Sequence, residues 1–190
     1  MRASSLGAEE LQALQDDLAY HQMRVLLLID AVSQIKGNAG KLDGLTKLAK
    51  LDFLVRYPSL AQRVLDKFTP EGTKFALANR AEQVWSGVEA PMIRYKYGPW
   101  DNRYYPIIGA LVGRGLARYT VGRRGSVALA TTPTGRRLSQ GLKNSNEWRL
   151  IAQQCEAVAQ AAAGLTGNAL KDLVYARLPE LMDRPHREVI

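Results

Sequence analysis

Cysteine and histidine are scarce in this chain of 190 residues, which holds one cysteine and two histidines. Cys155 alone cannot form a disulfide within the chain, and His21 and His186 have no spacing typical of a zinc site. Long apolar runs are also lacking, because the run at 25–29 stops at Asp30, far short of the length that spans a bilayer. The first residues lack the basic, apolar and small-residue regions of a signal peptide. We therefore expect a cytoplasmic protein with no metal site and no membrane contact.

Arrangements of residues that could carry catalysis are lacking as well. No serine has a nearby histidine and acid in a recognised arrangement, and Asp43 and Asp52 have no third ligand beside them. The glycine-containing loop at 36–43 differs from a phosphate-binding loop, because two residues rather than four separate Gly37 from the next Gly-Lys pair and a leucine follows. We predict no catalytic residue, no cofactor and no enzymatic activity.

Acidic residues are almost absent from one segment, 91–143, where Asp101 is the single acid among ten lysines and arginines. The net charge of the whole chain is +8, so this segment accounts for all of the basic excess. A concentrated basic surface is typical of a protein that binds a polyanion, with an affinity that falls as salt rises. The alternatives are a solvated surface that keeps the protein soluble and a docking face for an acidic protein. We favour nucleic acid because the charge is so completely partitioned.

The same segment predicts a defined order of elements. It reads as an extended stretch at 92–97, a turn at Gly98-Pro99, a helix that begins near 104–106 and ends at 113 or 115, a strand at 116–121, a basic turn at 122–125 and a returning strand at 126–131. Thr132 or Thr134 can cap a following helix, with Pro133 near its first turn. This order is typical of a winged helix whose wing is the hairpin at 116–131. The predicted fold class is α+β and mostly α-helical, a winged helix-turn-helix with a two-stranded wing and flanking N- and C-terminal helices.

Helical patterns cover most of the remaining chain. We expect helices at 8–35 (with a possible break near Tyr20), 44–57, 59–67, 74–85, 144–163 and 168–176, the last capped by Thr166. In the helix at 44–57, Lys47, Lys50 and Arg56 are expected to face outward. The predicted organisation is an N-terminal amphipathic arm at 1–20, a winged-helix domain at 21–143 and a C-terminal helical extension at 144–190.

Candidate binding residues follow from the charge and the aromatic content of the basic segment. The predicted DNA-binding residues are Arg103, Arg114, Arg118, Arg123, Arg124, Arg136 and Arg137. The predicted partner-binding residues are Tyr97, Trp100, Tyr104 and Tyr105, although such rings more often brace a corner of the core with their polar tips at its rim. The presumed recognition helix, PIIGALVGRG, lacks the polar side chains that read base edges. We therefore predict sequence-independent contact with the backbone of double-stranded DNA.

Three stretches resemble a known family: KLDGLTKLAKLDFLVRYP at 41–58, YKYGPWDNRYYPIIGALVGRGL at 95–116 and TPTGRRL at 132–138. They are similar to the middle components of bacterial ABC-three-component, or Lamassu-type, defence systems against phage and plasmids. The resemblance implies a noncatalytic winged-helix subunit that bridges an SMC-like coiled-coil ATPase and an effector, commonly a nuclease, in a hetero-oligomer. The alternatives are a free-standing winged-helix transcription regulator, which would not explain the apolar recognition helix, and an antitoxin-like interaction domain, suggested by the turn YGPW.

Overall fold

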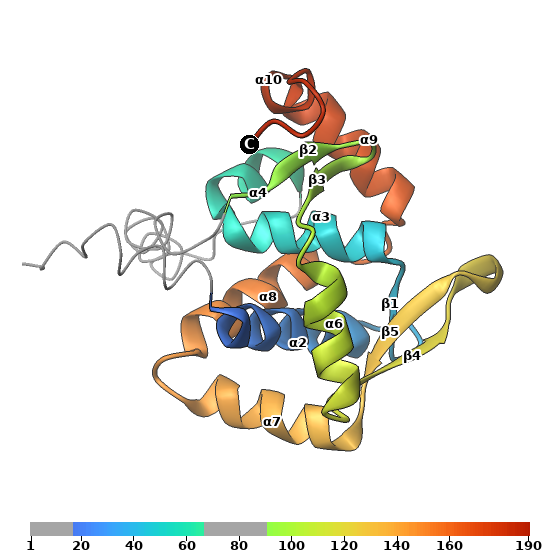
Figure 1. The fold of residues 1–190 in the computed structure, drawn as a ribbon, viewed down its shortest axis with the longest axis vertical. Coiled ribbons are helices and arrows are strands. Elements are labelled where there is room, and N and C mark those ends of the chain that lie inside the picture. The colour runs from blue at the N-terminus through green and yellow to red at the C-terminus, as the bar shows by residue number, and fades with distance from the viewer. Residues whose placement is uncertain (1–16, 67–90) are drawn as a thin grey trace, which may run out of the picture.

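The computed structural model describes residues 17–66 and 91–190. These residues form an α+β fold of helices with two small antiparallel sheets (Figure 1), which confirms the α+β and mostly helical prediction. The helices are α2 (Leu18–Gln34), α3 (Leu45–Arg56), α4 (Pro58–Val64), α6 (Tyr104–Gly113), α7 (Pro133–Asn144), α8 (Arg149–Ala161), α9 (Gly167–Arg177) and α10 (Pro179–Met182). The strands are β1 (Leu42–Asp43), β2 (Ile93–Tyr95), β3 (Gly98–Trp100), β4 (Ala117–Val121) and β5 (Val127–Thr131). The helix expected at 74–85 and most of the expected N-terminal arm lie outside the described residues.

Helix α2 is the centre of the core. Asp17 caps its start, because its Oδ1 accepts hydrogen bonds from the amides of Ala19 and Tyr20 at 2.8 and 3.2 Å. All residues at 24–33 are buried, since α6, α7, α8 and β5 pack around the helix. Burial of one large aliphatic side chain contributes about 1.5–3 kcal/mol, so the apolar run at 25–29 is a main source of stability.

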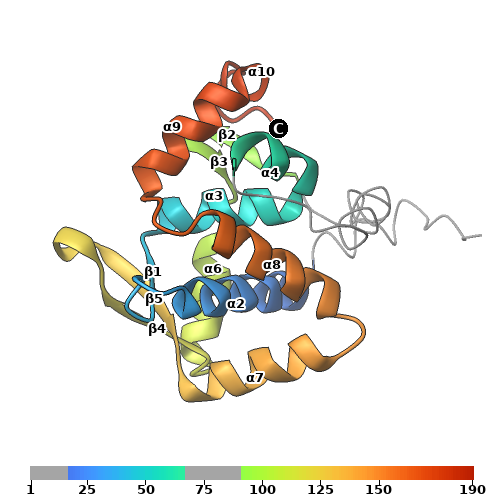
Figure 2. The ribbon, with the colours of Figure 1, turned by 180° about the vertical axis from the view of Figure 1, so that it is seen from behind.

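A three-stranded sheet joins distant parts of the sequence in the order β1-β5-β4. In β5, Leu129 lies opposite both Leu42 of β1 and Tyr119 of β4. The β4–β5 hairpin projects away from the helices in both views (Figures 1 and 2). The two hairpin strands agree with the sequence prediction, whereas β1 is too short to produce a recognisable pattern.

The second sheet corrects one prediction. The sequence predicts a turn at Gly98-Pro99, but these two residues lie in strand β3. The turn is two residues earlier, at Lys96 and Tyr97. A proline can occupy β3 because β3 is an edge strand of the two-stranded sheet. The last residues of the chain close over β2, where the amide of Ile190 donates to the carbonyl of Met92 at 2.9 Å.

The C-terminal helices share the core with the N-terminal ones. The helix predicted at 144–163 is α8, which begins five residues later because α7 continues to Asn144 and a short connection follows. Helix α8 packs on α2 and α3, and α9 packs on α3 and α10 (Figure 2). Thr166 caps α9 as expected, its hydroxyl accepting from the amide of Ala169 at 3.1 Å.

This packing corrects the expectation for helix α3. Lys47, Lys50 and Arg56 were expected to face outward, yet they are only 8%, 1% and 4% exposed. The reason is that α3 lies among α8, α9 and β3, so little of its circumference reaches solvent.

Candidate nucleic-acid and partner interfaces

The hairpin of β4 and β5 ends in a short basic turn that is fastened to β1. The turn is a single 3-10 turn at Arg123–Gly125, in which Arg124 and Gly125 have φ of 54° and 77°. The carboxylate of Asp43 accepts a hydrogen bond from the backbone amide of Arg123 at 3.2 Å. Gly122 makes this approach possible, since a Cβ there would lie 2.7 Å from Oδ1 of Asp43 and 2.6 Å from the hydroxyl of Ser126. The turn is therefore held in a fixed place relative to the core.

Three of the predicted DNA-binding arginines lie on this hairpin. Arg118, Arg123 and Arg124 are all exposed. Within the described part of the chain, none of their guanidinium groups has a hydrogen bond or an ion pair. Unpaired, exposed guanidinium groups on a projecting hairpin can contact phosphate without first breaking an internal pair.

Two further candidates lie in the first turns of α7. The Arg136 side chain is 59% exposed, and its Nε is 4.0 Å from the carboxylate of Asp30. Arg137 is exposed and donates to the hydroxyl of Thr134 at 3.2 Å. Both remain available to a polyanion, because the contact of Arg136 with Asp30 is long and the acceptor of Arg137 is a neutral hydroxyl.

Arg103 and Arg114 have other partners. The guanidinium of Arg103 donates twice to Asp101, from Nη2 at 2.7 Å and from Nε at 3.0 Å, and its side chain is only 24% exposed. Arg114 is exposed but donates to the side-chain oxygen of Gln22 at 2.9 Å. We therefore remove Arg103 from the predicted DNA-binding set, since its charge is used to hold the start of α6.

That start of α6 is fixed by a buried polar network around Asp52. The carboxylate is fully buried and accepts hydrogen bonds from Arg24 at 2.8 and 3.2 Å, from Arg56 at 3.0 Å and from the hydroxyl of Tyr104 at 2.7 Å. Arg56 also donates to Asp101 at 2.8 Å. Burial alone would raise the pKa of Asp52, but the two guanidinium groups and the hydrogen bonds hold it well below its ordinary value. The network ties α2, α3 and α6 together by paired buried charges.

The outer face of α6 carries no side chain suited to base recognition. Its exposed residues are Tyr105, Pro106, Gly109 and Gly113, and its buried ones are Tyr104, Ile107, Ile108 and Leu111. Arg, Lys, Asn and Gln are the side chains that match the base edges of the major groove. None of these four residue types is among the exposed residues of α6.

Three of the four predicted partner-binding aromatics surround one pocket. Tyr97, Trp100 and Tyr105 line a cavity of about 250 Å³ together with Tyr95 and Lys50. Tyr97 and Tyr105 are 51% and 63% exposed. The ring of Trp100 lies 5.9 Å from that of Tyr105 and 6.0 Å from that of Tyr95. Exposed tyrosines around a tryptophan are typical of the anchor positions of protein interfaces.

The prediction is wrong for Tyr104 and incomplete for this pocket. Tyr104 is 0% exposed and bonded to Asp52, so it braces the core and cannot touch a partner. Lys50, which the sequence did not indicate, also lines the aromatic pocket, with its Nζ 3.5 Å from the carbonyl oxygen of Thr46. Burial lowers the pKa of its amine to about 8, and the charge of Lys171 adds to this effect. Only the packing of β3 and α9 on α3 explains its burial, and no sequence pattern shows it.

No family model, no curated protein and no solved structure matches the chain. At residues 17–66 and 91–190, no helix combines the length and the apolar character needed to cross a bilayer. Histidine, cysteine and acidic side chains in the same ranges do not gather into a group that could hold a metal ion.

Proposed function

We propose that this chain is a winged-helix subunit that holds the backbone of double-stranded DNA without reading base sequence. The observation that carries the proposal is the strand order β1-β5-β4, combined with a chain order in which α2, β1 and α3 come first and α6, β4 and β5 follow after α4, β2 and β3. A winged helix has the same order when α4, β2 and β3 are treated as an insertion, and its first strand pairs with the second strand of the wing. In that comparison, α6 takes the place of the recognition helix and the β4–β5 hairpin that of the wing.

The electrostatics of the hairpin support contact with phosphates. Arg118, Arg123 and Arg124 are exposed on it, and α7 adds Arg136 and Arg137. Contacts to phosphates position a protein on DNA but carry no sequence information. The outer face of α6 supports the second half of the proposal, since its exposed residues are a tyrosine, a proline and two glycines and include no Arg, Lys, Asn or Gln.

We further propose that the subunit is noncatalytic and bridges an SMC-like coiled-coil ATPase and an effector, such as a nuclease, in a bacterial defence complex. The support is the resemblance in the stretches at 41–58, 95–116 and 132–138, together with the aromatic pocket as a place for a partner. The pocket lies at the start of α6 and the wing follows its end, about 15 Å apart along a ten-residue helix. Two separate surfaces are what a bridging subunit requires.

Purification from cells that also carry the neighbouring genes tests this assembly. We expect the tagged chain to recover a large ATPase with coiled coils. Recovery of the chain alone, as a dimer on a palindromic DNA site, would instead favour the free-standing transcription regulator. The apolar outer face of α6 is the reason that we rank the regulator second.

A further inference from the structure

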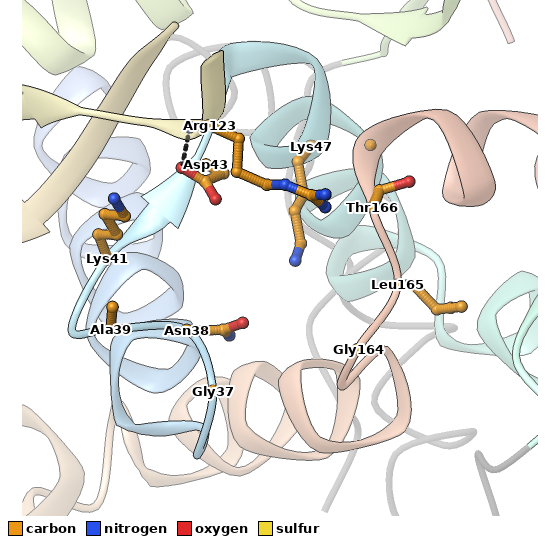
Figure 3. A pocket seen from close by; sticks show the side chains of 11 residues that line it. Gly37, Asn38, Ala39, Lys41, Asp43, Lys47, Arg123, Gly164, Leu165 and Thr166 are labelled. Carbon is orange, nitrogen blue, oxygen red and sulfur yellow. Dashed lines mark hydrogen bonds between the residues drawn. The ribbon is translucent and has the colours of Figure 1, made fainter. Parts of the chain in front are cut away.

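A second pocket, of about 380 Å³, opens behind the wing. Four parts of the chain meet there: the glycine-containing loop at 37–41, the start of α3, the turn of the wing and the start of α9 (Figure 3). None of the arginines at the wing tip or on α7 lines it apart from Arg123. Among the arginines that we propose for DNA, the pocket therefore shares Arg123 alone.

Lys47 is the central charge of this pocket. The residue is only 8% exposed, and its ammonium group points into the open middle of the pocket (Figure 3). Within the described residues, this ammonium group has neither a hydrogen bond nor an ion pair. Burial lowers the pKa of Lys47, Asp43 opposes that effect and Arg123 adds to it. A nearly buried cation without an acceptor is unfavourable, so the site is suited to a group that supplies negative charge.

The neighbouring charges do not neutralise Lys47. The guanidinium of Arg123 points toward it (Figure 3) and has no internal acceptor among the described residues. Asp43 accepts from the backbone amide of Arg123, but its carboxylate forms no ion pair with a pocket cation in the described part of the chain. Lys41 adds a third cation, whose Nζ donates to the carbonyl of Val121 at 2.7 Å. Three cations against one carboxylate leave the pocket positively charged.

Backbone amides reinforce this charge. Thr166 bonds the third amide of α9, which leaves the amides of Gly167 and Asn168 without an acceptor in the described ranges. Gly167 lies directly beside Lys47, because a Cβ at Gly167 would come 3.6 Å from the backbone nitrogen of Lys47. Helix α3 also begins at this pocket and has no side-chain cap. The first turn of a helix attracts anions through its free amides and its dipole.

We propose that this pocket binds a phosphate group, held by Lys47, Arg123 and the amide of Gly167. A phosphate fits better than a carboxylate because it carries up to two charges and enough acceptor oxygens for a guanidinium, an ammonium and an amide at once. The pocket volume lies at the lower end of the range for small-molecule sites, so the phosphate can carry a further group. Its source is either a free phosphorylated molecule or a phosphate of DNA that reaches the turn of the wing.

The loop at 36–43 alone does not have the spacing of a phosphate-binding loop. The lysine that faces the pocket comes from α3 and the arginine from the wing, more than 70 positions later in the chain. The folded chain therefore assembles the site from parts that no local motif connects.

Titration of the ¹⁵N-labelled full chain with inorganic phosphate, against chloride at equal ionic strength, tests the proposal. We expect the amide resonance of Gly167 to shift in a saturable way. Lys47→Met should weaken phosphate binding by roughly ten- to a hundredfold, the effect of one lost charge-assisted hydrogen bond. Lys36→Met is the matched control, because Lys36 is exposed at the start of the glycine-containing loop at 36–43 and does not line the pocket. Arg123→Ala should also weaken binding, and this exposed position tolerates truncation if Lys47→Met fails to fold.

The source of the phosphate is separated by two further titrations, with adenosine monophosphate and with a 20-base-pair duplex. A saturable Gly167 shift with the nucleotide and none with the duplex assigns the site to free phosphorylated molecules, and a Gly167 shift with the duplex that inorganic phosphate reverses assigns it to DNA. The proposal is overturned if none of the probes shifts the Gly167 resonance of wild type. It is also overturned if Arg123→Ala and any folded Lys47→Met bind phosphate as tightly as the control Lys36→Met. Duplex binding through Arg118 and Arg124 can survive either result, so the two proposals fail independently.

Discussion

Asp52→Asn is the substitution that tests most sharply how the start of α6 is held. The change keeps the size of the side chain, removes its charge and replaces one carboxylate oxygen by an amide donor. Oδ2 of Asp52 accepts from Arg24 at 3.2 Å, Arg56 at 3.0 Å and Tyr104 at 2.7 Å. Turning the amide does not help, because Oδ1 faces Nε of Arg24 at 2.8 Å. In either orientation, a donor therefore faces a guanidinium donor.

The expected loss of stability follows from the burial of Asp52 and its two arginine partners. Asp52, Arg24 and Arg56 have side chains that are at most 1% exposed, so water cannot replace the lost acceptor. Removing one partner of a buried ion pair costs about 3–5 kcal/mol. For a chain of this size, such a loss lowers the melting temperature by roughly 6–20 °C. Asp172→Asn is the control, since its carboxylate is 70% exposed and the change should stay within about 0.5 kcal/mol.

Urea unfolding followed by circular dichroism at pH 7 gives the free energy of unfolding of both variants. Because the pKa of Asp52 is lowered in the folded chain, its contribution is fully present above the unfolded value and is lost as pH falls. The difference between wild type and Asp52→Asn should thus shrink as pH drops below about 4, the pKa of an unfolded aspartate. A loss under about 1 kcal/mol at pH 7, with an unchanged slope against urea, would refute the assignment of Asp52 as the main counter-charge.

Two further predictions concern α7 and Lys50. Gly135→Ala should destabilise the fold by several kcal/mol in urea unfolding, because the new Cβ would lie 1.9 Å from the carbonyl oxygen of Leu116. Gly141→Ala, in the same helix, is the control: its Cβ would meet nothing within 4 Å, so it should stabilise the fold by about 0.5–1 kcal/mol. Equal effects of the two substitutions would contradict the packing of α7. Lys50→Met should raise the free energy of unfolding at pH 7 by up to about 3 kcal/mol, since the pKa of this buried amine falls from 10.5 to about 8. Between pH 8 and pH 10.5 the unfolded chain binds more protons than the folded chain, so the stability of wild type rises with pH. The stability advantage of Lys50→Met should therefore vanish by about pH 10.5. An advantage that does not change with pH would refute burial of a charged amine as its cause.

Local patterns predicted most of the elements. Capping signals located the start of α9 at Thr166 and narrowed the start of α7 to Thr132 or Thr134, of which Thr132 is the cap, because these signals act within one helical turn. The Gly98-Pro99 pair predicted a turn where the structure has strand β3, since Pro99 lies in an edge strand, which tolerates a residue without an amide donor.

The sites depended on contacts that no local pattern encodes. The aromatics Tyr97, Trp100 and Tyr105 were identified from composition, and the structure places them around one pocket. Lys47 and Lys50 were missed because their burial comes from α9 and β3 packing on α3, and α9 lies over a hundred residues away. Tyr104 was misassigned for the same reason, as its acceptor, Asp52, lies on a different helix.

The salt dependence of DNA binding tests the central claim most directly. Fluorescence anisotropy with two duplexes of unrelated sequence should give the same affinity for wild type, falling linearly on a log-log plot against salt. Arg118→Ala with Arg124→Ala should weaken both complexes equally and reduce the salt slope by about 2. Arg149→Ala, at an exposed arginine that begins α8 and belongs neither to the wing nor to α7, should leave the slope unchanged. Strong preference for one duplex, or an unchanged slope in the wing variant, would contradict a wing that holds the DNA backbone without reading sequence.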